Sequence, residues 1–313
     1  MKKLVTAAVL TTLMSSGAYA ENIGVSMAAF DDNFLTVLRN AMNDKGAELG
    51  VTLQAEDAQN EVGKQLNQIQ NFVASGVDAI IVNPVDTDAT IPMSKLAEDA
   101  GIPLVYVNRE PVNLMKLPAN QAYVGSQEIE AGNQQGQHAC DLFKAMGKTE
   151  DVKVAILMGD LSHQAARLRT QGAEEIFAGD DCNFISVVDK QTGMWQRTLG
   201  MDMVANWLSA GQDIDGVLAN NDEMAVGAAQ ALRTAGANFD ELVVAGVDGT
   251  IDAKALIESG EIDHTVFQDA VGQGKGAVDA AVKLARGEAA DQVVYIPFQL
   301  ITSENLADFA ETN

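Results

Sequence analysis

The chain has 313 residues, of which 47% are hydrophobic, and a formal net charge of -24 at pH 7. This acidity, with no run of Lys or Arg to offset it locally, excludes nucleic acid and anionic membrane surfaces as expected partners. The length exceeds what one typical hydrophobic core fills, so we expect two lobes.

The first twenty residues have the pattern of an export signal. Lys2 and Lys3 precede an apolar run from Leu4 to Leu13, and Ala18-Tyr19-Ala20 supplies small residues at a cleavage site. No later stretch reaches the roughly 18 uninterrupted apolar residues that a spanning helix needs. We therefore expect a signal peptide at 1–20, a mature chain from Glu21 and a periplasmic location.

From Ile23 onward, short β-branched strands alternate with helices. The pattern predicts strands at 23–27, 51–55, 79–82 and 102–107, with helices at 35–49, near 62–73 and from 85 to 100. Continuous apolar strands that alternate with helices are typical of a parallel sheet covered on both faces. This part of the chain predicts a first doubly wound lobe.

The same alternation starts again after Gly125. Helices are predicted at 128–146, 163–178, 196–210 and 222–235, and strands at 152–158, 184–188, 217–219 and 243–247. We predict an α/β fold of two doubly wound parallel-sheet lobes joined by three hinge crossings, near Gly125, near Gln268 and near 299–302. The first lobe is predicted to hold 21–125 plus 269–298, and the second 126–268 plus 299–313.

Only two cysteines occur, Cys140 and Cys182, and their spacing fits no redox or zinc motif. In an oxidising compartment they are a disulfide candidate, with two free thiols as the alternative. Three scattered histidines offer little to a transition metal. We expect no metal site and no cofactor.

Polar side chains gather where the predicted strands end. The carboxyl edge of a doubly wound sheet is where ligands bind, because the loops there are free of sheet hydrogen bonding. Carboxylates and amides suit neighbouring hydroxyls, Arg donates in a planar fork, and aromatic rings cover the C–H faces of a sugar. The set favours a neutral sugar or cyclic polyol, and the clusters are 30–34, 83–84, 108–110, 159–169, 194–195, 220–222, Asp248 and 268–269.

Each of these residues also has a structural interpretation. Asp32 and Asp222 could cap the helices that follow them. Trp195 could be a core residue, and His163 could be an exposed loop residue rather than a ligand contact. Capping explains single carboxylates, but it does not explain polar clusters at successive strand ends, so we favour binding.

Five segments carry a resemblance to a known family: FDDNF at 30–34, ASGVDAIIVNPVD at 74–86, VYVNREP at 105–111, ANNDEMAVGA at 219–228 and AGVDGT at 245–250. In these segments the chain resembles the periplasmic sugar-binding proteins of ribose- and galactose-type ABC importers, and the resemblance covers 22–313. It implies that the protein is not an enzyme. It implies capture of a monosaccharide or cyclic polyol by closure of the two lobes, and delivery to the permease of an ABC importer in the inner membrane.

The resemblance also implies a set of ligand contacts. Phe34 and Trp195 would cover the two faces of the sugar ring, one from each lobe. Gln268 would contact the ligand at a hinge crossing, and His163 falls where the galactose-binding branch has a ligand histidine. The contacts to hydroxyls would come from Asp32, Asn108 and Arg109 in the first lobe and from Arg169, Asn221 and Asp248 in the second.

The chain departs from the galactose-binding branch at three places. Ala28 stands near a tyrosine of that branch, and Ala165 stands at a ligand aspartate. The loss of an acceptor leaves a sugar hydroxyl unmatched, at a cost of about 1–3 kcal/mol. The stretch GKTEDVKV replaces an acidic calcium loop, so we expect no calcium there. The sequence at 30–42 and 163–170 resembles inositol-binding members of the family more than galactose-binding members.

Two other classes of protein, a glycosidase and a sugar-responsive repressor, share part of this pattern. A glycosidase needs two carboxylates about 5–10 Å apart, which Asp32 and Asp248 could supply, but no nucleophile motif is present and both acids lie among amide and Arg partners. A sugar-responsive repressor shares the two-lobe fold, but it begins with a DNA-reading motif rather than an export signal. We expect a monomer, with a chemoreceptor left open as a second partner.

Overall fold

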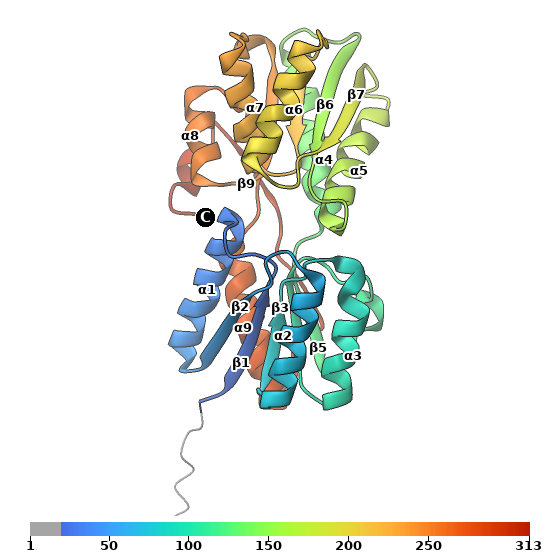
Figure 1. The fold of residues 1–313 in the computed structure, drawn as a ribbon. Helices are drawn as coiled ribbons and strands as arrows, with labels where there is room; N and C mark the ends of the chain where they lie inside the picture. The colour runs from blue at the N-terminus through green and yellow to red at the C-terminus, as the bar shows by residue number, and fades with distance from the viewer. Residues whose placement is uncertain (1–19) are drawn as a thin grey trace, which may run out of the picture.

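The computed structural model describes residues 20–313, so the predicted signal peptide lies outside the described residues except for Ala20. The described chain forms two α/β lobes stacked end to end, with the C-terminus beside their junction (Figure 1). Within 20–313, no helix combines the length and the apolar character that crossing a membrane requires.

The first lobe is built on a six-stranded parallel sheet with the strand order β11-β5-β4-β3-β1-β2. Helices α1 and α9 cover one face of this sheet, and α2 and α3 cover the other. The strands are β1 (Asn22–Met27), β2 (Thr52–Asp57), β3 (Ala79–Val82), β4 (Leu104–Asn108), β5 (Gln121–Gly125) and β11 (Val293–Tyr295), and the helices are α1 (Asn33–Leu49), α2 (Val62–Ser75), α3 (Thr90–Ala100) and α9 (Ala270–Ala285).

The second lobe repeats this plan with the strand order β12-β10-β9-β8-β6-β7. Only the pair of β10 and β12 is antiparallel. The strands are β6 (Val152–Met158), β7 (Ile185–Thr192), β8 (Gly216–Ala219), β9 (Val243–Asp248), β10 (His264–Phe267) and β12 (Gln299–Thr302), and the helices are α4 (Glu128–Ala145), α5 (Gln164–Ala178), α6 (Arg197–Ser209), α7 (Asp222–Thr234) and α8 (Ile251–Ser259).

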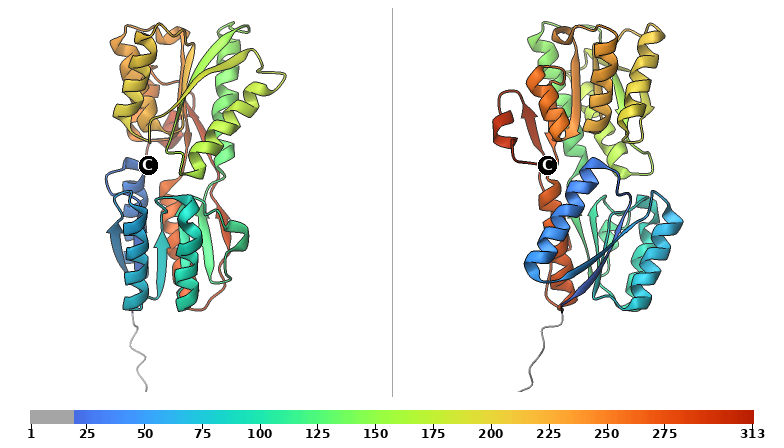
Figure 2. Two further views of the ribbon diagram at one scale, coloured as in Figure 1. Left: turned by 45° about the vertical axis from the view of Figure 1, so that its right-hand side comes forward. Right: turned by 60° about the vertical axis from the view of Figure 1, so that its left-hand side comes forward.

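The chain passes between the lobes three times. These passages connect β5 to α4, β10 to α9, and β11 to β12. The linking segments and the flanking helices are visible between the lobes in the turned views (Figure 2). The third crossing lies before Gln299 rather than within 299–302, because 299–302 is itself a strand that pairs with β10. The predicted fold of two doubly wound lobes is confirmed.

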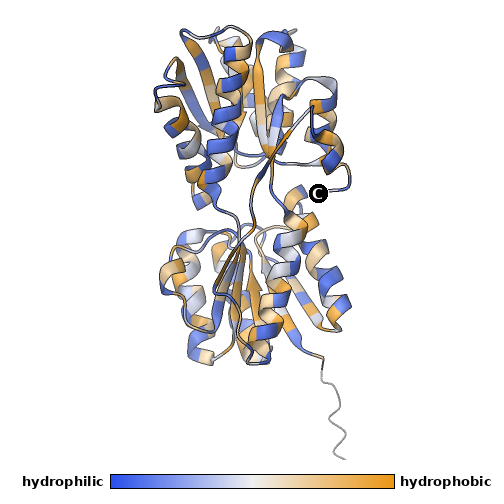
Figure 3. Ribbon diagram, turned by 180° about the vertical axis from the view of Figure 1, so that it is seen from behind, coloured by the Kyte–Doolittle hydropathy of each residue, from blue (hydrophilic) through white to orange (hydrophobic). Residues whose placement is uncertain are grey.

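The cores follow from the sequence pattern. Strands β3, β4, β5, β8, β9 and β10 are buried along their whole length, as expected for apolar strands covered on both faces. The helices instead alternate hydrophobic and hydrophilic stripes (Figure 3). Helices α1, α2, α3 and α8 each end at a glycine in the left-handed region, which halts the helix and returns the chain to the sheet.

A disulfide joins α4 to the loop that follows α5. Cys140 and Cys182 are bonded across 42 residues, with both side chains buried. They lie in the apolar cluster between α4, α5 and the second sheet. The bond therefore ties α4 to the segment between α5 and β7, within the second lobe.

A binding cleft between the two lobes

The carboxyl ends of the strands in the two lobes face each other across a cleft. Its inner part is a cavity of about 40 Å³, and an outer chamber of about 540 Å³ opens from it. Asp32, Leu35, Arg109 and Trp195 line both parts, so the two spaces are continuous. The inner cavity is lined by Asp32, Leu35, Asn108, Arg109, Glu128, Ala165, Arg169, Trp195, Asn221, Asp248 and Gln268.

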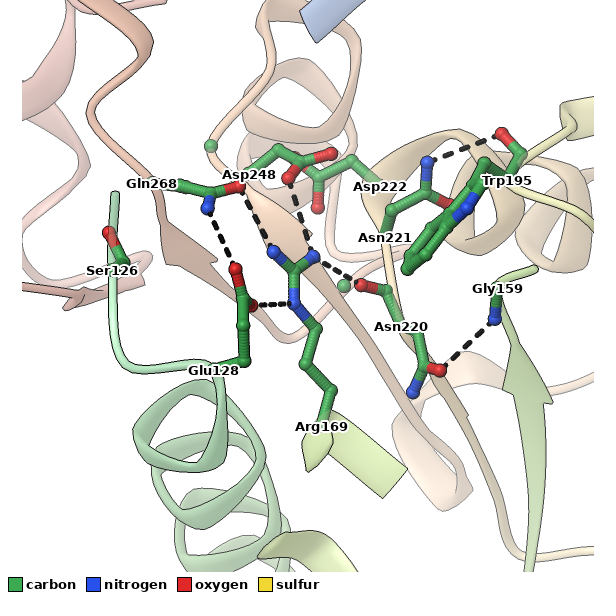
Figure 4. Close-up of polar contacts among 12 residues, drawn as sticks. Ser126, Glu128, Gly159, Arg169, Trp195, Asn220, Asn221, Asp222, Asp248 and Gln268 are labelled. Carbon is green, nitrogen blue, oxygen red and sulfur yellow. Dashed lines mark hydrogen bonds and ion pairs between the residues drawn. The ribbon is translucent and has the colours of Figure 1, made fainter. Parts of the chain in front are cut away.

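Arg169 on α5 is at the centre of the polar contacts that the second lobe makes around the inner cavity. Its Nε donates to Glu128 Oε2 at 2.6 Å, and its Nη2 donates to Gln268 Oε1 at 3.0 Å. Its Nη1 donates to Asn220 O at 2.8 Å and lies 3.7 Å from Asp248 Oδ1 (Figure 4). Burial by itself lowers the pKa of Arg169, but the surrounding carboxylates raise it above its ordinary value. The guanidinium is therefore a fixed cation.

Two buried aspartates lie at the ends of β8 and β9. Burial raises the pKa of Asp248 well above its usual range, although Arg169 opposes the shift. Burial also raises the pKa of Asp222 to about 7. Asp222 is not the cap of α7, as the sequence had suggested, because Asn221 holds that position and accepts from Met224 N–H at 3.1 Å.

Asp222 instead supports the loop after β9. Its Oδ1 accepts from the Thr265 hydroxyl at 2.6 Å, and its Oδ2 accepts from Thr250 N–H at 2.7 Å. Asp248 has a positive φ of 128°, a rare backbone conformation for a residue with a side chain. Asp222 thus fixes the segment that carries Asp248 into the cavity.

The first lobe presents one carboxyl group, from Asp32, and one guanidinium group, from Arg109, to the cavity. Asp32 caps α1, because its Oδ1 accepts from Leu35 N–H at 2.8 Å, so capping and placement in the cleft are compatible roles. Arg109 donates to Pro84 O at 2.7 Å, which holds the guanidinium at the end of β4. Burial lowers the pKa of Arg109 to about 10 and raises the pKa of Asp32. The nearby opposite charge moderates both shifts.

Asn108 is positioned by one residue that follows β3 and by one residue on α9. Its Oδ1 accepts from Asn83 Nδ2 at 3.2 Å, and its Nδ2 donates to Gln273 Oε1 on α9 at 3.2 Å. Its φ of 66° turns the chain sharply at the end of β4. This conformation is one that Asn tolerates better than most residues. The turn places Asn108 and Arg109 at the same edge of the sheet.

Trp195 and His163 form one unit on the second lobe. Trp195 Nε1–H donates to His163 Nδ1 at 2.7 Å, and the two ring planes are nearly parallel, at 13°, with centroids 5.9 Å apart. His163 is only 3% exposed, so the expectation of an exposed loop residue is wrong. Trp195 of its own lobe and Val85 of the opposite lobe both contact the ring. Trp195 is partly buried and lines the cleft, which is consistent with the role that the resemblance implied.

Phe34 is not among the residues that line the inner cavity or the outer chamber, so its contact with the ligand stays a prediction. Phe34 and the next residue, Leu35, both belong to the apolar cluster of the first lobe, and Leu35 also lines the inner cavity. Successive residues of a helix point about 100° apart, so a shift of one position selects a different side chain.

Eight of the ten predicted contacts line the inner cavity, and His163 lines the outer chamber. Sequence reasoning missed Glu128, which is 3% exposed and enters from the first residue of α4. Its place immediately after the first hinge crossing was the only available signal. It also missed Leu35, which the helical spacing from Asp32 could have indicated.

The two lobes are in direct contact around the cleft. Thr87 Oγ1 of the first lobe donates to Ser162 O at 3.0 Å, and Asn33 Nδ2 donates to Glu223 Oε1 at 2.8 Å. Gln164 Nε2 of the second lobe donates to Glu110 Oε1 at 3.0 Å. Both rims are thus bridged, and the described chain is in a closed form.

The fold and the cleft define a class of protein. Two lobes on a hinge enclose a small polar cavity with fixed carboxylates, amides and two guanidinium groups, which match a solute with several hydroxyl groups. The chain belongs to the family described as periplasmic binding protein domain, whose model matches residues 23–289.

Known relatives narrow the class. The chain is 55% identical, over all of both chains, to a protein of Rhizobium meliloti named as a rhizopine-binding protein. It is 32% identical, over 96% of its own length and 95% of the relative, to a D-galactose/methyl-galactoside binding periplasmic protein of Haemophilus influenzae. A solved ABC-transporter solute-binding protein of Bacillus halodurans with bound myo-inositol is 38% identical, with a TM-score of 0.85, and the match covers 94% of this chain and 99% of that one. The protein is a sugar- or polyol-binding component of an ABC importer.

Proposed function

We propose that the protein captures a cyclic polyol of the inositol type, closes around it and presents the closed form to the permease of its importer. The observation that carries the proposal is the chemistry of the inner cavity. Asp32, Asn108, Arg109, Asp248 and Gln268 reach it from both lobes and from a hinge crossing. A ring with a hydroxyl on every carbon can use donors and acceptors on all sides.

The residues at the galactose-branch positions support a cyclitol over galactose. Ala165 lines the inner cavity and supplies no acceptor there, and Ala28 is buried. The relative from Rhizobium meliloti is named for the binding of rhizopine, an inositol derivative, and the Bacillus halodurans neighbour holds myo-inositol. We infer the ligand class from these features together.

Hinge closure is the mechanism that the lobe contacts support. Contacts to the ligand come from both lobes, so only the closed form makes the full set, and the ligand stabilises that form. The residues of the inner cavity suit binding of the ligand without a chemical reaction. Arg169 neutralises the acids nearest to it, and no nucleophile with an adjacent base faces the inner cavity among the described residues.

The test is a thermal-shift screen of the mature chain, starting at Glu21, against inositols, alditols, hexoses and pentoses. A ligand at 100 times its dissociation constant adds about 2.7 kcal/mol to the free energy of unfolding. Small-angle scattering then compares the best ligand with buffer. We expect stabilisation by inositols, contraction on binding, an unchanged ligand after incubation and a monomer by light scattering. Stabilisation by a hexose with no response to any inositol would refute the ligand class, and conversion of the ligand would refute the absence of catalysis.

A further inference from the structure

His163 joins the two lobes through both of its ring nitrogens. Nδ1 accepts from the indole N–H of Trp195 at 2.7 Å, and Nε2 lies 2.7 Å from the carbonyl oxygen of Val85. An indole nitrogen can only donate, so Nδ1 must be the unprotonated nitrogen. The proton is then on Nε2, which donates to Val85 O. One neutral tautomer therefore satisfies both bonds.

The acceptor belongs to the opposite lobe and is held in place. Val85 follows β3 in the first lobe, whereas His163 immediately precedes α5 in the second. Val85 N–H donates to the side chain of the buried Gln65 at 2.7 Å, and Gln65 donates in turn to Asn83 O at 2.9 Å. The His163 bond to Val85 therefore forms only when the lobes approach each other.

On its other side, His163 is bonded to Trp195, the aromatic residue of the cleft wall. Trp195 lines both the inner cavity and the outer chamber. Trp195 and Met194 have positive φ angles of 67° and 51°, which residues with side chains rarely adopt. The indole ring lies directly on Gly159, where a Cβ atom would come within 2.1 Å of the ring. The orientation of Trp195 is thus set by its loop, by Gly159 and by His163.

We propose that His163 is a positioning residue: it latches the closed lobes through Val85 and couples closure to the orientation of Trp195, and it does not bind the ligand directly. This role differs from the ligand histidine that the resemblance implied, because both ring nitrogens are already used within the protein. The latch goes beyond the capture of a polyol and applies to any solute that the cleft closes on.

The latch makes closure sensitive to protons. An imidazolium has no lone pair at Nδ1, so protonation removes the bond from Trp195. The charged groups that act on the ring are Arg109 from the first lobe and Asp160 and Arg167 from its own segment. Burial, followed by Arg109, lowers the pKa of His163 to about 3, although Asp160 opposes the shift.

The direction of the effect follows from the two pKa values. In open lobes the ring contacts water, and its pKa returns toward the ordinary 6.5 or so. The closed form then binds fewer protons than the open form between these values. The contribution of His163 to closure is fully present above about pH 6.5 and is lost as the pH falls, by up to about tenfold per pH unit.

The first experiment needs no ligand. The variants are His163→Gln, which cannot titrate, and Thr87→Val, which removes the hydroxyl's bond to Ser162 O, keeps the longer bond from Thr87 N–H at 3.4 Å and leaves His163 unchanged. Proton–nitrogen spectra resolve the two indole N–H groups between pH 5 and 8, and Trp207, which donates to Asp189, serves as the reference. We expect the Trp195 resonance to titrate in the wild type and not in H163Q. In T87V the midpoint should move toward 6.5, because weaker closure exposes the ring.

The second experiment measures myo-inositol binding by calorimetry over the same pH range and rests on the proposed function. H163Q should bind about two- to tenfold more weakly at pH 8, as expected for the loss of one hydrogen bond, and the wild type should lose more affinity than H163Q on acidification. T87V should bind more weakly and keep the wild-type slope. The difference between the two profiles isolates His163 from the buried aspartates.

Three results overturn the latch. They are a Trp195 resonance in H163Q that matches the wild type at all pH values, an unmoved midpoint in T87V, and parallel affinity profiles in wild type and H163Q. If H163Q does not fold, the midpoint in T87V decides the question. If myo-inositol gives no heat, the proposed ligand fails, and the indole spectra still test the latch.

Discussion

The buried ion pair between Arg169 and Glu128 offers a quantitative test of the site's architecture. The side chains are 4% and 2% exposed, and their closest atoms are 2.6 Å apart. Arg169→Met removes the cation and leaves Glu128 as an uncompensated charge. Removing one member of a buried pair costs about 3–5 kcal/mol, because the remaining charge keeps its desolvation penalty.

A double-mutant cycle separates this effect from general damage. Glu128→Gln should cost a similar amount, since it leaves the guanidinium without its closest carboxylate. The double variant, R169M with E128Q, should lose less than the sum of the single variants, because no uncompensated charge remains at this pair. We expect a coupling free energy of about 1–3 kcal/mol.

The assay is urea unfolding at pH 7, with the slope of each transition compared between variants. The matched control is Lys190→Met, which removes a pair of 2.7 Å with Glu174 whose side chains are 40% and 38% exposed. Exposed pairs contribute about 0–1 kcal/mol, so this variant should change little. Additivity of R169M and E128Q within about 0.5 kcal/mol would refute the interpretation that Arg169 is fixed through Glu128.

Further predictions address the cleft wall, a buried acid and the disulfide. Trp195→Ala should weaken polyol binding at least tenfold, because the ring supplies about 1.5–3 kcal/mol of apolar burial; a change below twofold in calorimetry would contradict its place on the wall. The raised pKa of Asp222, about 7, means that the folded state binds the extra proton, so the wild type should lose stability as the pH rises from 4 to 7, by up to about 1.4 kcal/mol per pH unit. Asp222→Asn should flatten that profile in unfolding experiments, and parallel curves would exclude Asp222 as the source. Replacing Cys140 and Cys182 together with Ala should cost about 4 kcal/mol, as expected for a closed loop of 42 residues, and reductant should lower the melting temperature of the wild type alone.

The predicted clusters at the strand ends show how much of the binding cavity the sequence pattern predicts. Asn108 and Asp248 end two strands, Asn221 caps α7 and Arg169 lies in the second turn of α5, and all four line one cavity. The rule that parallel strands end at a common edge was enough to group them. Position along the chain therefore predicted which residues meet, because the topology converts strand order into proximity.

The exceptions have physical causes that a sequence does not carry. Phe34 and Leu35 are adjacent, and the rotation of one helix decided that Leu35 lines the cleft. The ring of His163 is enclosed by Trp195 of its own lobe and by Val85 of the other lobe, which lies 78 residues away in the chain. Glu128 has no motif of its own, and its role depends on the approach of Arg169 from a helix 41 residues away.

The sequence by itself determined the two-lobe α/β fold, the edges at which the ligand groups gather and the family to which the chain belongs. These features depend on local periodicity and on residues in short segments, which are fixed before the chain folds. Only the tertiary structure decided which face of α1 borders the cleft, how Glu128 fixes Arg169 and how His163 connects the lobes. Those contacts depend on the relative placement of elements far apart in the chain. A shift of about one ångström between two elements is enough to make or break a hydrogen bond.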